Sequence, residues 1–161
     1  MAWRIEHEDE RIGCYRSIGD WFITTEVSNF DDSTTVAMIV RANETKLRDG
    51  RSITPPLFYI RCMESITSIY IYSSNKHLVS GSVDYRVDDR PAGIWSMNES
   101  TDNEGLGFWG KSRAIPAAKE LFGGALLRIR FWPDNESAVE VTFNITGLEE
   151  QIVPLREACN W

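Results

Sequence analysis

Two short runs, PLFYIRC at residues 56–62 and ITSIYIY at residues 66–72, decide the fold of this chain. Both are rich in β-branched and aromatic side chains, and only Met63, Glu64 and Ser65 separate them. Runs of this composition joined by so short a connection are typical of neighbouring antiparallel strands. We therefore expect residues 56–72 to form the centre of a β-sheet.

Further segments with apolar residues at alternate positions lie on both sides of this pair, at residues 21–27, 34–42, 83–88, 126–132 and 139–145. An alanine-rich stretch at 114–122 predicts one short mid-chain helix, and 148–159 predicts a short C-terminal helix. Strands at this spacing, without a βαβ rhythm, indicate a sandwich or barrel. The sequence predicts a mainly β protein, an antiparallel β-sandwich of about eight strands over 19–161, preceded by an N-terminal arm or short helix at 1–18.

The charge balance limits the classes of partner. The 161 residues include 17 basic and 24 acidic side chains, which gives a formal net charge of −7. An acidic chain is a poor binder of nucleic acid or of anionic membranes. It can associate with a basic protein surface, although plain solubility is the commoner reason for such a charge.

No apolar run approaches the ~20 residues of a membrane-spanning helix, so we expect no membrane insertion. The first ten residues lack the apolar core of a secretory signal, so the chain as written is expected in the cytoplasm. If a signal has been removed, the expected compartment is the periplasm.

No motif predicts catalysis. The three cysteines, Cys14, Cys62 and Cys159, lack the CxxC spacing of a structural zinc site. GLGFWG at 105–110 matches the letters of a dinucleotide-binding loop, but the polar residues 100–104 stand where such a loop needs a hydrophobic strand. These glycines are better explained by a hairpin or a close-packed loop. We expect no catalytic, metal or cofactor site, and an enzyme such as a wall-cleaving hydrolase is the least favoured class.

Charged side chains alternate with apolar ones along several predicted strands: Arg61, Arg86, Arg128, Arg130, Asp84, Asp88 and Glu140. If these strands are neighbours, opposite charges can form cross-strand ladders. The alternative is a protein-binding face, because Tyr, Trp and Arg are enriched at interface hot spots. That candidate face consists of Tyr70, Tyr72, Arg128, Arg130 and Trp132. The ladder is the explanation we favour.

Several segments together resemble the type VI secretion-associated TagO/VasI-like family. These are ERIGCY at 10–15, SNFDDSTTV at 28–36, LFYIRC at 57–62, VDYRV at 83–87 and LREACNW at 155–161. The resemblance implies a non-enzymatic, secreted or periplasmic accessory protein. Similar domains occur in phage and prophage genomes without export signals. The alternative function is therefore a cytoplasmic phage- or prophage-encoded protein that binds and inhibits a bacterial host complex.

The resemblance also bears on the cysteines. Family members carry a further cysteine just upstream of the segment that matches Cys14, and this sequence has none there. That leaves Cys62 and Cys159 as the implied pair, with Cys14 unpaired. In a reducing cytoplasm the pair would stay as two thiols packed as small buried hydrophobes. The partner protein and the oligomeric state are not specified by the sequence.

Overall fold

The computed structural model describes residues 14–47 and 53–161. Its strands are β1 (Cys14–Ile18), β2 (Trp21–Val27), β3 (Thr34–Leu47), β4 (Leu57–Met63), β5 (Ile66–Tyr72), β6 (Gly81–Val87), β7 (Gly93–Glu99), β8 (Gly105–Phe108), β9 (Leu126–Phe131) and β10 (Val139–Asn144). Its helices are α1 (Lys111–Glu120), α2 (Leu148–Gln151) and α3 (Val153–Cys159).

The predicted central pair is confirmed. β4 and β5 are antiparallel neighbours, with Leu57 opposite Tyr72 and Met63 opposite Ile66. The two turn residues, Glu64 and Ser65, both have positive φ, as a two-residue hairpin of right-handed twist requires. This tight turn fixes which side chains of the two strands lie side by side.

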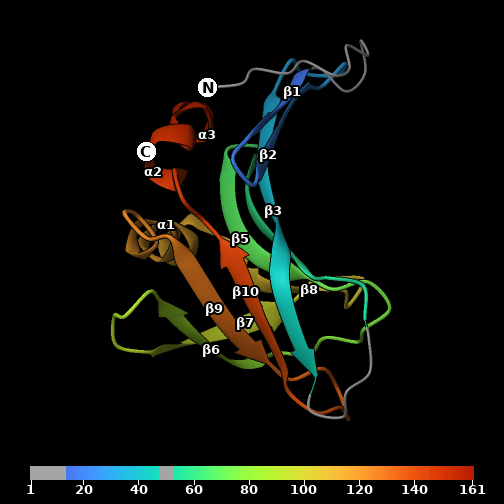
Figure 1. Cartoon of the computed structure of the whole chain (residues 1–161). Helices are drawn as coiled ribbons and strands as arrows, with labels where there is room; N and C mark the ends of the chain where they lie inside the picture. Colours follow the sequence, from blue (N-terminus) through green and yellow to red (C-terminus); the bar gives the residue numbers. More distant parts are fainter. Residues whose placement is uncertain (1–13, 48–52) are drawn as a thin grey trace.

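The sheet is a closed eight-stranded β-barrel, so the predicted sandwich is wrong. Its strand order is β3-β10-β9-β6-β7-β8-β5-β4, and β4 pairs with β3 to complete the ring (Figure 1). The 14-residue strand β3 makes one closure, because residues 36–41 pair with β4 and residues 42–47 pair with β10. The other closure joins β7 to β8. Both edges that a sandwich leaves open are therefore hydrogen-bonded.

Apolar side chains at alternate positions of the strands fill the barrel. The largest fully buried residues include Trp21, Met38, Phe58, Phe131 and Phe143. The β1–β2 hairpin extends the sheet along the first half of β3. Cys14–Ile18, the end of the predicted arm, is thus a strand, while residues 1–13 lie outside the described part.

The helices gather on one side of the barrel, together with the C-terminus (Figure 1). The predicted mid-chain helix is confirmed as α1, which packs on β5 and β8 with Ala114, Ala117 and Ala118 buried. The predicted C-terminal helix is divided into α2 and α3. Pro154 lies in the first turn of α3, where its missing N–H costs no helical hydrogen bond.

Candidate functional site

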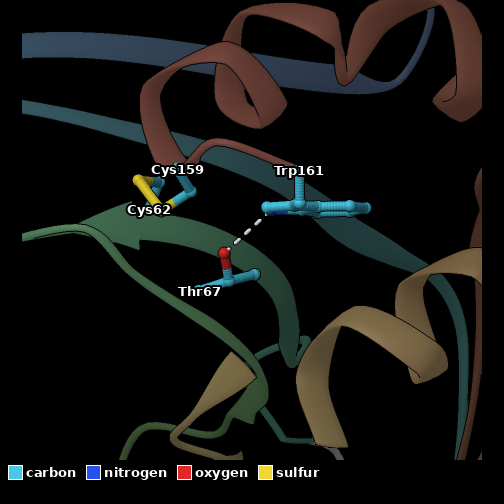
Figure 2. Close-up of a disulfide and its surroundings, with 4 residues drawn as sticks. All are labelled: Cys62, Thr67, Cys159 and Trp161. Carbon is cyan, nitrogen blue, oxygen red and sulfur yellow. Dashed lines mark hydrogen bonds between the residues drawn. A yellow bond between two sulfur atoms is a disulfide. The ribbon is translucent and has the colours of Figure 1, made fainter. Parts of the chain in front are cut away.

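The C-terminal tail is fastened to the hairpin of β4 and β5. Cys62, which is fully buried on β4, forms a disulfide with Cys159 at the end of α3, and their Cα atoms are 5.8 Å apart. Two residues further on, Trp161 donates a hydrogen bond from Nε1 to Thr67 Oγ1 at 2.9 Å (Figure 2). Arg156 donates to the Trp161 carbonyl and lies over its ring. The cysteines that the family resemblance pairs are therefore joined, across 97 residues of sequence.

Aromatic rings cover the outer surface of the same hairpin and the adjoining end of β8. We call this surface the aromatic wall and define it as Tyr59, Arg61, Tyr70, Tyr72 and Trp109. The Tyr70 ring is stacked between Tyr59, at 4.7 Å, and Trp109, at 4.8 Å. Tyr72 meets Tyr59 edge-on at 6.3 Å. With the loop that carries Ser100 and Asp102, the wall borders an open hollow of about 640 Å³.

Gly107 on β8 makes this arrangement sterically feasible. It pairs with Tyr70, and a Cβ atom at position 107 would lie 2.3 Å from the Tyr70 Cβ and 2.2 Å from the Ile69 carbonyl oxygen. No side chain fits there, so the Tyr70 ring can lie against the backbone of β8. In the GLGFWG segment, Gly105 and Gly107 are therefore strand residues.

The electrostatics of the aromatic wall suit binding. Burial raises the pKa of Tyr70 to about 12 and also raises the pKa of Tyr59, so both hydroxyls stay neutral at physiological pH. The Arg61 guanidinium lies 5.3 Å from the Tyr70 ring centre, and its buried Nε lacks a hydrogen-bond partner. Tyr72 donates its hydroxyl proton to Glu104 at 2.9 Å. The wall thus presents neutral aromatic rings beside the Arg61 cation.

A carboxylate rim borders these rings. Glu99 and Asp102 line the hollow, and Glu104 accepts the hydrogen bond from Tyr72. The Ser100 hydroxyl and the Glu104 backbone N–H donate to Asp102, which lowers the pKa of that carboxyl. The rim is therefore negatively charged at neutral pH.

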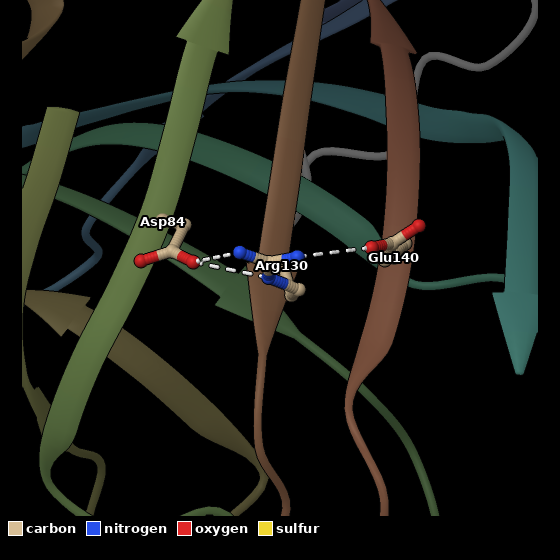
Figure 3. Close-up of polar contacts among 3 residues, drawn as sticks. All are labelled: Asp84, Arg130 and Glu140. Carbon is tan, nitrogen blue, oxygen red and sulfur yellow. Dashed lines mark hydrogen bonds and ion pairs between the residues drawn. The ribbon is translucent and has the colours of Figure 1, made fainter. Parts of the chain in front are cut away.

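A second surface, across the barrel, is built from charges. We call it the charged wall and define it as the outward side chains of β6, β9, β10 and the end of β3. Arg130 donates to Asp84 from Nη2 at 2.6 Å and from Nε at 3.0 Å, and to Glu140 from Nη1 at 3.4 Å (Figure 3). The bond to Asp84 and its charge raise the pKa of Arg130. The predicted ladder is confirmed for these three residues.

The predicted protein-binding face is divided between these two surfaces. Tyr70 and Tyr72 lie on β5, whereas Arg128 and Arg130 lie on β9, with Trp132 one residue beyond its end. Three strands separate β5 from β9 in either direction round the ring. Trp132 is 43% exposed and lies beneath the Arg130 guanidinium. The five residues therefore do not form one face.

Sequence reasoning missed Tyr59 and Trp109. Tyr59 had a usable signal, because a hairpin that turns at Glu64 and Ser65 places it opposite Tyr70. Trp109 had none, since its contact with Tyr70 depends on the pairing of β5 with β8, which is distant in sequence.

Within residues 14–47 and 53–161, no helix has the length and apolar character needed to cross a membrane. The same ranges hold no group of three or more His, Cys, Asp or Glu side chains placed to bind a metal ion.

Comparison with known proteins gives one match. A family model described as "Type VI secretion system VasI, EvfG, VC_A0118" matches residues 19–161. No curated protein and no solved structure matches the chain at a significant level. The matched range includes both walls and the disulfide.

Proposed function

Since the chain belongs to the VasI family of type VI secretion proteins, we propose that it is a non-enzymatic accessory protein of such a system. In this proposal it binds a protein partner through the aromatic wall. Catalysis has no part in it.

The observation that carries the proposal is the position of the aromatic rings. The outer face of an antiparallel sheet is normally polar, because only the inner face packs on the core. Here Tyr59, Tyr72 and Trp109 are only half-buried on that outer face, around a hollow. Rigid aromatic side chains with an arginine among them are typical of interface hot spots, since they bury a large area with little loss of conformational freedom.

The chemistry of the partner follows from the carboxylate rim. Glu99, Asp102 and Glu104 place negative charge beside the rings, in a chain whose formal net charge is −7. Complementary charge favours a basic protein surface that carries an apolar or aromatic projection. A nucleic acid or an anionic membrane would be repelled.

The disulfide supports a periplasmic location. Disulfides persist in oxidising compartments and are rare in the cytoplasm. Intact mass of protein purified from its native host, without reductant, should show the loss of two hydrogens that a Cys62–Cys159 bond requires. Three free thiols would contradict this location and would fit the cytoplasmic phage- or prophage-encoded inhibitor instead.

Secretion itself tests the function. A host that lacks this gene should lose or reduce type VI-dependent release of protein, and wild-type chain should restore it. Tyr59→Ala should restore it poorly, whereas Trp132→Ala, which removes an equally outward ring from the opposite surface, should restore it fully. Equal rescue by both variants, with equal protein levels, would refute a role for the aromatic wall.

A further inference from the structure

Two rows of outward side chains cross the charged wall, and their charges differ. The first row, from β6 to β3, is Asp84, Arg130, Glu140 and Lys46, with alternating signs. The second row, two residues along each strand, is Arg86, Arg128, Thr142 and Glu44. Its first two members carry the same charge and lie directly opposite one another. Like charges in such a pair are destabilising.

The two arginines lack the carboxylate partners that Arg130 has. Arg86 donates from Nε to the Arg90 carbonyl at 2.9 Å and from Nη2 to the Asp89 carbonyl at 3.4 Å. These bonds hold its side chain in place without cancelling its charge. Among the described residues, none forms a hydrogen bond or ion pair with the Arg128 guanidinium.

Neighbouring carboxylates are already engaged. Asp84 and Glu140 bind Arg130, and Glu44 pairs with Lys46 at 3.2 Å. Asp88 lies within electrostatic range of Arg128 and keeps its charge, but its carboxylate accepts hydrogen bonds from the backbone N–H groups of Ala125 and Leu126 and forms no direct ion pair with that guanidinium. Positive charge at the Arg86–Arg128 pair is therefore left in excess.

A hollow of about 220 Å³ lies over this pair. The Thr142 hydroxyl-bearing side chain borders it, and the buried residues Ile129 and Val141 contribute to its lining. Its charged lining residues are four cations (Lys46, Arg86, Arg128 and Arg130) and three anions (Glu44, Asp84 and Glu140). An acidic protein thus carries a local positive excess at a concave point of its surface.

We propose that Arg86 and Arg128 form a binding subsite for an oxyanion, either a phosphate or a carboxylate group. Planar guanidinium groups bind both kinds of oxyanion through paired hydrogen bonds. A bound anion between the two side chains would convert their repulsion into attraction. The subsite lies on the wall opposite the aromatic one, so it is independent of the function proposed above.

Titration with inorganic phosphate and with acetate, in chloride buffer, tests the subsite. Side-chain and backbone NMR signals of Arg86 and Arg128 should shift and saturate. Arg128→Gln should weaken phosphate binding at least tenfold, and Arg41→Gln, the matched control at an exposed position of β3 that does not line the hollow, should leave it unchanged. Tighter binding of phosphate than of acetate, increasing above pH ~6 as phosphate gains its second charge, identifies a phosphate ligand. Comparable affinities identify a carboxylate.

Stability provides a second readout. Without added anion, Arg128→Gln should have a melting temperature equal to or above that of wild type, because it removes a repulsion. Phosphate should raise the melting temperature of wild type and not that of Arg128→Gln. Shifts that never saturate, or an equal loss of binding in Arg41→Gln, would overturn the proposal. Arg128→Gln should still restore type VI secretion. The anion subsite and the aromatic wall can therefore be refuted independently of one another.

Discussion

The aromatic wall and the charged wall lie on opposite sides of one barrel, and they differ in how their side chains cover its outer face. Each must cover the outer face of strands whose inner side chains fill the core. The charged wall uses ion pairs that remain about half exposed, such as Arg130 with Asp84 and Glu140. The aromatic wall stacks its rings, so that Tyr70 is only 8% exposed although it points outward. The half-buried rings of the aromatic wall leave apolar surface beside a hollow, where a partner could cover it.

The disulfide is expected to produce the largest effect, and it fastens the aromatic half alone. Cys62→Ser combined with Cys159→Ser should lower the free energy of unfolding by about 2–5 kcal/mol, because the bond closes a long loop in the unfolded chain. Chemical denaturation measures this loss, with Cys14→Ser as the control that keeps the bond.

Hydrogen exchange locates the consequence of that loss. Amides of α3 should exchange faster in the double variant, since a chain terminus frays unless it is tied down. Amides of β9 and β10 should exchange faster only by the amount that the lower global stability of the double variant accounts for. Unchanged exchange in α3 would mean that the bond does not hold the tail on β4.

Gly107→Ala should produce the next largest effect. Its Cβ would meet Tyr70 and the Ile69 backbone at less than 3 Å, so β8 must move away from β5, at a cost of about 3 kcal/mol. Gly81→Ala makes the same change on β6, on the side of the charged wall, where the nearest atom is 4.0 Å away. That control should stay within about 0.5 kcal/mol of wild type. Equal losses in the two variants would show that close packing is not peculiar to the aromatic side.

The stability of the protein at alkaline pH tests the burial of Tyr70 in the aromatic wall. Burial raises the pKa of Tyr70 to about 12, against an ordinary value near 10. Between these values the folded state binds more protons than the unfolded state, so stability falls as pH rises. The expected loss attributable to Tyr70 is roughly 2 kcal/mol.

Tyr70→Phe should remove that part of the pH dependence. A remainder should persist, because burial and the bond to Glu120 also raise the pKa of Tyr85 to about 12. Absorbance of tyrosinate, followed together with unfolding, measures both. A Tyr70 that ionises near pH 10 would contradict its enclosed position.

Arg130→Gln should give the smallest effect. Exposed ion pairs contribute little, because water and salt screen them. The melting temperature should fall less than in Gly107→Ala, and the difference from wild type should vanish near ~1 M salt, where screening acts within ~3 Å. A large loss that salt does not reduce would show that the charged wall supports the barrel in a way its exposure does not explain.

The local parts of this fold were predictable, and its closure was not. The composition of β4 and β5 and their short connection define the hairpin, and the alternation of β9 and β10 predicts the pairing of Arg130 with opposite charges. Closure depends on β3 changing partner half-way along its length and on two residue pairs between β7 and β8. Neither leaves a pattern in the sequence. Because the order of the strands round the barrel could not be predicted, Tyr70 and Arg130 were assigned to one face.

We infer that the aromatic wall, and not the charged wall, contacts a partner in the type VI apparatus. The most direct measurement is the amount of type VI components that co-purify with tagged chain from native envelopes, compared between Tyr59→Ala and Trp132→Ala. Before this comparison, thermal unfolding should show a cooperative transition for both variants, which confirms that they are folded. If Tyr59→Ala does not fold, Tyr72→Ala takes its place. We expect at least a tenfold loss for the aromatic-wall variant and wild-type recovery for Trp132→Ala. Undiminished recovery with the aromatic-wall variant would contradict it.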